Sequence, residues 1–177
     1  MAVKSGWVYK NRIALKSMIR VIFGAVWIID GYFKFQPGIT DTFTQLIQQA
    51  GAGQPAWLLP WFNFWFNVVS QNTAFWVYLV GIGEVLIGIA LILGGTRKIT
   101  YIVGMVLSLF IWAVPEGLGG PYGPGSTDIG TGIIYAFVFL SLIIFNAMEG
   151  PSKYSADYYI EKKVKWWHKL AEFSPKS

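Results

Sequence analysis

The sequence contains no cysteine and a single histidine, His168. Without cysteine the chain forms no disulfide, thiolate-ligated metal site or iron–sulfur cluster, and it has no cysteine nucleophile. One histidine also cannot supply both axial ligands of a bis-histidine haem. Charged residues are scarce, at 13% of the chain against about a quarter in an average soluble domain. We therefore expect this chain to hold no haem, metal or iron–sulfur cluster.

Apolar side chains are abundant instead, at 54% of the 177 residues, and 18% are aromatic. They come in blocks too long for a soluble core, and a helix that crosses a bilayer needs about 20 mostly apolar residues. Four stretches are candidate spans: 17–35, 73–94, 99–114 and 129–148. The third is short, so a re-entrant or interfacial segment is its alternative. The first lacks a small-residue cleavage site and is expected to remain as a helix.

Lysine and arginine are distributed unevenly around these spans. Five precede or open the first span, two lie between the second and third, and six follow the fourth, whereas the loops 36–72 and 115–128 have none. Because basic loops stay cytoplasmic, we predict an all-α, multi-pass protein of the cell membrane. It would be a four-transmembrane-helix bundle with both termini cytoplasmic and both long loops outside. The net charge of +5 then reflects topology and contact with anionic membrane lipids, and indicates no nucleic-acid partner.

The predicted chain has three parts: a basic cytoplasmic N-terminus at 1–16, the membrane domain at 17–148 and a cytoplasmic tail at 149–177. In the tail, apolar residues recur at helical spacing beside lysines, which predicts an interfacial amphipathic helix on the inner leaflet. A docking site for a cytoplasmic partner is the alternative.

The first outer loop is predicted to be helical. Asp41 is placed to cap one short helix, and Pro55 to open a second at its first turn. The second helix carries three tryptophans at intervals of four residues: Trp57, Trp61 and Trp65. Such a stripe is typical of an aromatic belt at the headgroup level. A lid over a lipid-soluble ligand such as a quinone is the alternative.

Ionisable residues interrupt two of the spans. Asp30 and Lys34 lie four residues apart in the first, so they share a helix face and are placed to pair. Glu84 lies near the middle of the second, where an ionisable residue is by default a functional hypothesis. Three glycines around it allow another helix to approach closely: Gly81, Gly83 and Gly88. Glu84 and Asp30 are candidate proton donors, and an interhelical hydrogen bond is the structural alternative for Glu84.

The second outer loop contains Glu116 and five glycines, and it ends with Ser126, Thr127 and Asp128. These last three residues are N-cap candidates for the following helix. Free amides at a helix start after a glycine-rich turn also form an anion site. A plain capped helix explains the same residues, and the charge of Asp128 opposes a dianion unless it is neutralised.

Residues 115–122 (Pro-Glu-Gly-Leu-Gly-Gly-Pro-Tyr) and 125–135 resemble the corresponding stretch of DoxD proteins. Shorter stretches are similar to the first and second helices of the wider DoxX-like group: Arg20 with 31–34, and Gly83 and Glu84 with Gly88. The resemblance spans residues 17–148. It implies a four-helix membrane subunit that, with a small single-span DoxA subunit, forms a thiosulfate:quinone oxidoreductase. DoxD is also known as a companion of a terminal quinol oxidase.

Two functions follow as expectations. In the first, the chain is an oxidoreductase subunit, and quinone is a co-substrate bound beside Trp76, Trp112 or Tyr122. Thiosulfate would bind outside near Glu116, Ser126, Thr127 and Asp128, with Lys34 as counter-charge and with Glu84 and Asp30 as proton donors. In the second, the chain is a non-catalytic subunit packed against terminal oxidase subunits.

Overall fold

The computed structural model describes residues 6–124, 126, 128–150 and 152–173. These residues form eight α-helices, which confirms the predicted all-α class. The α-helices are α1 (Trp7–Phe33), α2 (Ile39–Ala50), α3 (Leu59–Ser70), α4 (Thr73–Leu93), α5 (Arg97–Ala113), α6 (Thr131–Glu149), α7 (Ala156–Ile160) and α8 (His168–Ala171). Two short 3₁₀ turns accompany them: η1 (Gly117–Gly119) and η2 (Lys165–Trp167).

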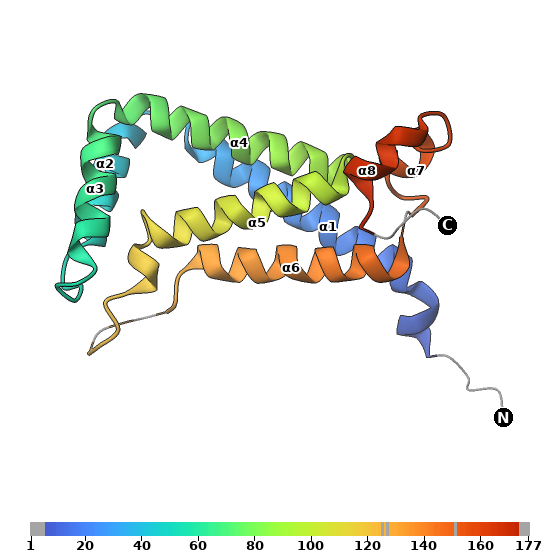
Figure 1. Ribbon diagram of the computed structural model, residues 1–177, viewed down its shortest axis with the longest axis horizontal. Coiled ribbons are helices and arrows are strands. Elements are labelled where there is room, and N and C mark those ends of the chain that lie inside the picture. Colours follow the sequence, from blue (N-terminus) through green and yellow to red (C-terminus); the bar gives the residue numbers. More distant parts are fainter. Residues whose placement is uncertain (1–5, 125, 127, 151, 174–177) are drawn as a thin grey trace.

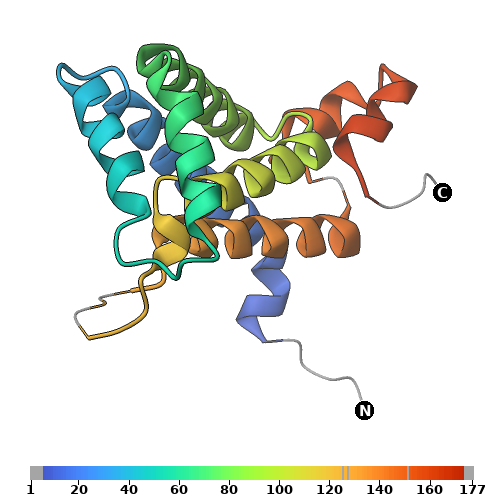
Figure 2. The ribbon, with the colours of Figure 1, turned by 60° about the vertical axis from the view of Figure 1, so that its left-hand side comes forward.

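The four long helices α1, α4, α5 and α6 run alongside one another (Figure 1). α1 packs mainly on α4, and α5 mainly on α6. At one end, here called the loop end, α2 and α3 lie across the bundle beside the segment 114–130 (Figure 2). At the opposite end, the tail end, α7 and α8 lie against the turn between α4 and α5. The arrangement separates the two loops at one end from the chain's charged tail at the other.

Within the described part of the chain, α4 and α6 are long and apolar enough to cross a membrane, with mean hydropathies of 2.3 and 2.1. Only 33% and 28% of their apolar windows are buried inside the protein, so much of their outward surface is apolar. The helix α1 carries too many charged residues to qualify in the same way, and α5 has only 17 residues.

The contact between α1 and α4 depends on glycine. A Cβ on Gly88 would lie 2.7 Å from the backbone oxygen of Gly24, and one on Gly24 would lie 2.8 Å from that of Gly88. Gly31 similarly faces the backbone of Gly81. The predicted close approach at Gly81 and Gly88 is therefore confirmed. Gly83 has ordinary space instead, since a Cβ there would lie 3.7 Å from the side chain of Leu107.

Both helices of the first loop exist, but they begin differently from the prediction. The N-cap of α2 is Gly38, at a left-handed φ of 78°, and Asp41 lies in the first turn without capping it. The helix α3 starts at Leu59 with Pro60 in its first turn, so Pro55 does not open it. Glycine adopts the left-handed conformation of Gly38 without steric cost. Proline is favoured in the first turn of a helix, and in α3 it is Pro60 that occupies this position.

The prediction of one amphipathic tail helix is wrong for the described residues of 149–177. The tail consists of three short elements, α7, η2 and α8, and α8 packs against α5. Its acidic residues explain the break, since Asp157 accepts the amide protons of Thr96 (2.7 Å) and Arg97 (2.9 Å). The Arg97 guanidinium, 2% exposed, pairs with Asp157 at 3.0 Å and with Glu172. A continuous helix along the membrane would leave this buried arginine without its partners.

Candidate functional site

Four ionisable residues from distant parts of the sequence meet in one cavity of about 230 Å³ near the loop end, here called the polar chamber. They are Asp30 of α1, Lys34 directly after α1, Glu84 of α4, and Glu116 after α5. The other residues of its wall are Trp27, Ser108, Ile111, Thr131, Gly132 and Tyr135. The structure thus joins predicted proton donors, the predicted counter-charge and one predicted substrate residue.

Lys34 forms its ion pair with Glu84, not with Asp30. Its Nζ lies 3.3 Å from Oε2 of Glu84, whose side chain is almost fully buried, and it also reaches the backbone oxygen of Asp30 at 3.4 Å. Gly81 permits this pairing, because a Cβ there would lie 2.6 Å from the Cβ of Lys34. The predicted Asp30–Lys34 side-chain pair is therefore wrong, since close packing on α4 turns the lysine toward that helix.

The Asp30 carboxylate is bound by Tyr135 of α6, whose hydroxyl donates to Oδ2 at 3.0 Å. No role was predicted for Tyr135, because a tyrosine in an apolar helix is usually a core residue with a polar tip. Its place at the end of the loop motif was the only signal. Asp30 and Tyr135 thus form a second polar pair in the same chamber as Lys34 and Glu84.

A second cavity of about 230 Å³ lies beneath α2 and α3, and we call it the apolar chamber. Aromatic and aliphatic residues form most of its wall: Ile39, Phe43, Leu46, Ile47, Trp65, Val69, Trp76, Val80, Phe110, Val114 and Pro115. The rings of Trp65 and Phe110 meet edge to face, with centroids 4.7 Å apart. Its remaining wall residues also line the polar chamber: Lys34, Glu84, Ile111 and Glu116. An apolar cavity with a few convergent polar groups has the general character of a small-molecule site.

The predicted tryptophan stripe divides between chamber and surface. Trp65 lines the apolar chamber, Trp61 donates its Nε1–H to the backbone oxygen of Ala113 at 2.8 Å, and Trp57 precedes α3 and is 77% exposed. Residues of α2 and α3 thus cover the apolar chamber, while Trp57 and Trp61 lie at the surface, and the belt and the lid both stay predictions.

Of the three predicted quinone contacts, Trp76 lies in the wall of the apolar chamber. Trp112 instead donates its Nε1–H to the backbone oxygen of Ile129 at 2.7 Å. Tyr122 donates its hydroxyl to the backbone oxygen of Leu118. Neither of these two residues lines the apolar chamber, so they hold the second loop in place.

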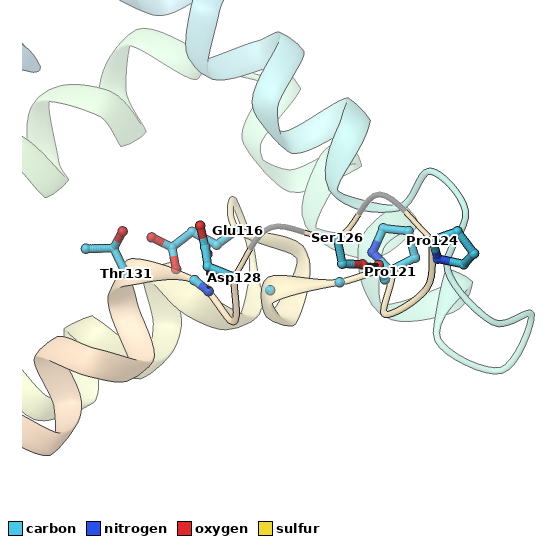
Figure 3. A pocket seen from close by; sticks show the side chains of 9 residues that line it. Glu116, Pro121, Pro124, Ser126, Asp128 and Thr131 are labelled. Carbon is cyan, nitrogen blue, oxygen red and sulfur yellow. Dashed lines mark hydrogen bonds between the residues drawn. The ribbon is translucent and has the colours of Figure 1, made fainter.

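The second loop encloses an open pocket of about 480 Å³, here called the loop pocket. Glu116 and Asp128 lie side by side at the start of α6, and Ser126 lies farther out beside Pro121 (Figure 3). Ser126 donates to the backbone oxygen of Pro121 and accepts the amide proton of Gly123 at 2.9 Å. The described lining of this pocket contains both carboxylates and no lysine or arginine. Thr127, the other predicted substrate residue, lies outside the described residues.

The start of α6 differs from the prediction. Its N-cap is Gly130, at a φ of 93°, and no side chain caps it from that position. Asp128 accepts the amide proton of Gly130 at 2.7 Å, and Glu116 accepts that of Gly132 at 2.8 Å. The N-cap assignment of Ser126 and Asp128 is therefore wrong. A carboxylate 16 residues upstream reaches the helix start, where sequence adjacency provides no signal.

Burial raises the pKa of the Glu116 carboxyl above its ordinary value, and the nearby negative charge of Asp128 adds to this. The backbone amides of Gly132 and Thr131 act in the opposite direction, because hydrogen bonds to a carboxylate favour its charged form. A carboxyl with a raised pKa holds its proton to higher pH than an exposed carboxyl does, and a positioned carboxyl is a common proton-transfer group. Glu116 is thus suited to proton transfer.

In the described ranges, no three histidine, cysteine, aspartate or glutamate side chains are grouped so that they could hold a metal ion. No family model matches the chain, and no curated protein or solved structure matches it either. The candidate site is therefore defined by its own geometry: two adjoining chambers and the loop pocket, all at the loop end.

Proposed function

We propose that this protein is a four-helix membrane subunit of a thiosulfate:quinone oxidoreductase, and that it binds the quinone in the apolar chamber. One observation carries the proposal: the apolar chamber and the polar chamber share a wall that contains Lys34, Glu84 and Glu116. A quinone needs an apolar surface for its ring and proton-donating groups at its carbonyl oxygens, and these two chambers offer both side by side.

The membrane placement is supported by the parallel course of the four long helices. Besides α4 and α6, the helix α5 has 17 residues, which at 1.5 Å per residue is about 26 Å, near the lower limit for a span. The described lysine and arginine residues other than Lys34 lie toward the tail end, which favours a cytoplasmic position for it. The loop end, with both chambers near it, then faces outward.

The chemistry of the shared wall fits quinone reduction. Two thiosulfates join through a new S–S bond and release two electrons, and quinone takes up these electrons with two protons to become quinol. Glu84 lies in the wall of the apolar chamber and is a direct proton donor. Asp30, bound to Tyr135 in the polar chamber, supplies a second proton to the same wall. Lys34 stabilises the negative charge that develops on a quinone oxygen as electrons arrive.

Thiosulfate as electron donor, and a DoxA-like single-span partner, are supported by the resemblance of residues 115–135 to DoxD proteins. The loop pocket on its own is poorly suited to a dianion, because its described lining combines two carboxylates with no basic residue. We therefore place the thiosulfate site where a partner subunit contributes positive charge to this face. Lys34 serves the quinone chamber and not the thiosulfate site.

Photolabelling with an azido-quinone tests the proposal directly. In the purified complex, labelled peptides are expected from the wall of the apolar chamber, and decyl-quinone is expected to compete with the label. Trp76→Leu removes an aromatic wall residue and should weaken competition by about fivefold, since a buried aromatic contact is worth about 1 kcal/mol. Trp57→Leu is the matched control, because Trp57 is exposed outside the chamber. Equal effects of the two substitutions would contradict quinone binding at this site.

Thiosulfate-dependent quinone reduction by the same complex, with every co-purifying chain identified by mass spectrometry, tests the donor. A second candidate function has one supporting observation: α3 presents Trp61 and Phe64 at the surface, with Trp57 next to them. Such a face suits contact with another membrane subunit. Haem- or copper-bearing chains in the same peak, without quinone reduction, would identify an accessory subunit of a terminal oxidase.

A further inference from the structure

We propose that Glu116 is the residue through which the site takes up protons, from the loop pocket into the polar chamber and on to Glu84. The inference deepens the proposed function and rests on it, because it names the source of the protons that a quinone in the apolar chamber consumes. Glu116 was predicted from sequence to contact substrate in the second outer loop, and the structure places it in the walls of both the loop pocket and the polar chamber.

The position of Glu116 is the first argument. It lines the loop pocket, the polar chamber and the apolar chamber. No other described residue lines all three cavities. Thr131 borders the loop pocket and the polar chamber beside it. The amide of Gly132 holds the carboxyl in place at 2.8 Å. A proton that enters the protein from the water of the loop pocket therefore meets Glu116 first.

The character of the polar chamber is the second argument. Trp27 is 1% exposed, and its Nε1–H has no hydrogen-bond partner among the described residues. Oε2 of Glu84 is likewise without a hydrogen bond there, although it lies 3.3 Å from Lys34. Buried polar atoms of this kind are normally satisfied by water. A polar cavity of about 230 Å³ has room for several water molecules, each of which occupies about 30 Å³ in the liquid.

In the proposed path, a hydrogen-bonded chain of water in the polar chamber connects Glu116 with Glu84, since both residues line that cavity. The charged and titratable groups that face this path are Asp128 from the loop, Asp30 from α1, Lys34 directly after α1, Glu84 from α4 and Tyr135 from α6. Described residues of α5 contribute Ser108 and Ile111, which do not titrate. Each proton that Glu116 passes inward is replaced from the loop pocket. One turnover therefore consumes two protons from that side and leaves Glu116 unchanged.

The exchange of hydrogen for deuterium at Glu84 tests the path without any need for turnover. The carboxyl band of Glu84 is identified in infrared spectra, at a pH low enough to protonate it, by its loss in Glu84→Gln. Exchange of this band after a switch to D₂O is then followed in the reconstituted complex. Glu116→Gln keeps an oxygen for the amide of Gly132 but carries no exchangeable carboxyl proton. It should slow exchange by about a hundredfold, the lower end of the range of effects for a positioned acid–base group.

Glu116→Asp restores a carboxyl group and should recover part of the rate, whereas Asp41→Asn, which alters an exposed carboxylate on α2, should leave it unchanged. Exchange at the original rate in Glu116→Gln would overturn the proposal, as would equal slowing by Asp41→Asn. If Glu116→Gln does not fold, Glu116→Asp is the deciding variant. Its shorter side chain moves the carboxyl group back by one methylene, so an exchange rate equal to that of the wild type would contradict the path. Photolabelling of the same samples separates the two proposals, because loss of quinone binding with exchange intact would contradict the quinone site alone.

Discussion

At the scale of single residues, the site depends on how a lysine is directed toward a glutamate inside a helix bundle. Lys34 leaves α1 against Gly81, and its ammonium group therefore reaches Glu84 on α4. Both residues line the polar chamber, and the Glu84 side chain is almost fully buried. A buried ion pair is weak support for stability, so its position at the wall of two cavities is better explained by chemistry.

Glu84→Gln should lower quinone turnover by roughly 10²-fold, as expected for loss of a general acid. The amide oxygen still faces Lys34, so the complex should assemble and bind quinone. Steady-state quinone reduction and size-exclusion chromatography measure the two properties. Glu149→Gln is the control, because Glu149 pairs with Arg12 at the tail end, away from the chambers. A variant that no longer assembles would assign Glu84 a structural role.

Glu116 should give the folded protein a characteristic pH dependence. Because its pKa is raised by burial in the folded state, the folded protein binds this proton more tightly than the unfolded chain. Its stabilising contribution is therefore complete below the ordinary carboxyl pKa of about 4.3 and declines as pH rises through the raised value. Thermal midpoints of wild type and Glu116→Gln, measured across this range, should differ in slope, with the flatter profile in the variant. If the thermal midpoints of the two proteins changed with pH in parallel, the raised pKa of Glu116 would be contradicted.

The candidate residues were largely predictable, but their partners were not. Asp30, Lys34 and Glu84 stand out because ionisable groups are rare in apolar stretches, and Glu116 because it lies in the glycine-rich second outer loop. Which of them pair depends on helix contacts that no local pattern encodes. Helical spacing favours Asp30 with Lys34, yet the glycine contact with α4 redirects the lysine. The roles of Tyr135 and of Glu116 at the start of α6 likewise depend on segments brought together only by folding.

At the scale of helices, the α1–α4 contact is a sharp test of packing. Gly88→Ala adds a methyl group against the backbone of Gly24 and the side chain of Ile28 and should destabilise the protein by about 1–3 kcal/mol, as overpacking usually does. Gly83→Ala lies on the same helix but meets only an ordinary contact at 3.7 Å, so it should be neutral or slightly stabilising. Thermal unfolding in detergent compares the two. Equal midpoints would show that α1 and α4 do not meet at Gly88.

The attachment of the tail makes a second prediction at this scale. Asp157 accepts hydrogen bonds from the backbone and side chain of Arg97 and from Trp167. Asp157→Ala should cost about 3–5 kcal/mol, because it leaves a buried arginine without one of its carboxylates. Limited proteolysis should then cleave the tail much faster.

Glu161→Gln serves as the control for that experiment, since it weakens a more exposed pair with His168 whose loss should cost about 1 kcal/mol or less. Cleavage at equal rates in both variants would contradict the buried contact between Asp157 and Arg97.

The bounds of α4, α5 and α6 could be predicted closely, whereas α1 begins ten residues before the expected residue 17 and the shape of the tail could not be predicted. The second span was expected at 73–94 and α4 covers Thr73–Leu93, because a long apolar run with a capping Asn72 and a final Gly94 defines its own ends. The tail has a helical period, but its shape is decided by Asp157 and Glu172, which bind an arginine 60 and 75 residues away. Periodicity contains no information about such a partner.

At the scale of the whole molecule, the two ends should lie on opposite sides of the membrane. The absence of cysteine makes this easy to test, since a single introduced cysteine has no competitor. Asn67→Cys lies on α3 at the loop end, and Lys163→Cys lies in the tail, and both positions are exposed. A membrane-impermeant maleimide added to intact cells should label Asn67→Cys at once and Lys163→Cys only after permeabilisation. Labelling of both from outside would contradict the topology.

The placement of the proton path also has an energetic consequence for the whole molecule. If thiosulfate delivers electrons from the loop end and Glu116 takes up protons from the same side, no net charge crosses the bilayer during quinone reduction. The reaction should then run at the same rate with and without a membrane potential. By contrast, a reaction that moved one elementary charge across the whole bilayer against the potential would cost about 2.3 kcal/mol per 100 mV.

The buried Arg97 has a further consequence for how the protein is made. Asp157 follows it by 60 residues, so at about 5–20 residues per second the ribosome needs roughly 3–12 seconds to produce the partner. In the proposed membrane topology, the newly inserted α4–α5 hairpin would hold this arginine at the membrane surface during that interval. The segment that completes this turn is thus translated only after all four long helices. A transcript truncated before Asp157 would yield an inserted but unfinished protein, marked for the cell's proteases by its uncovered arginine.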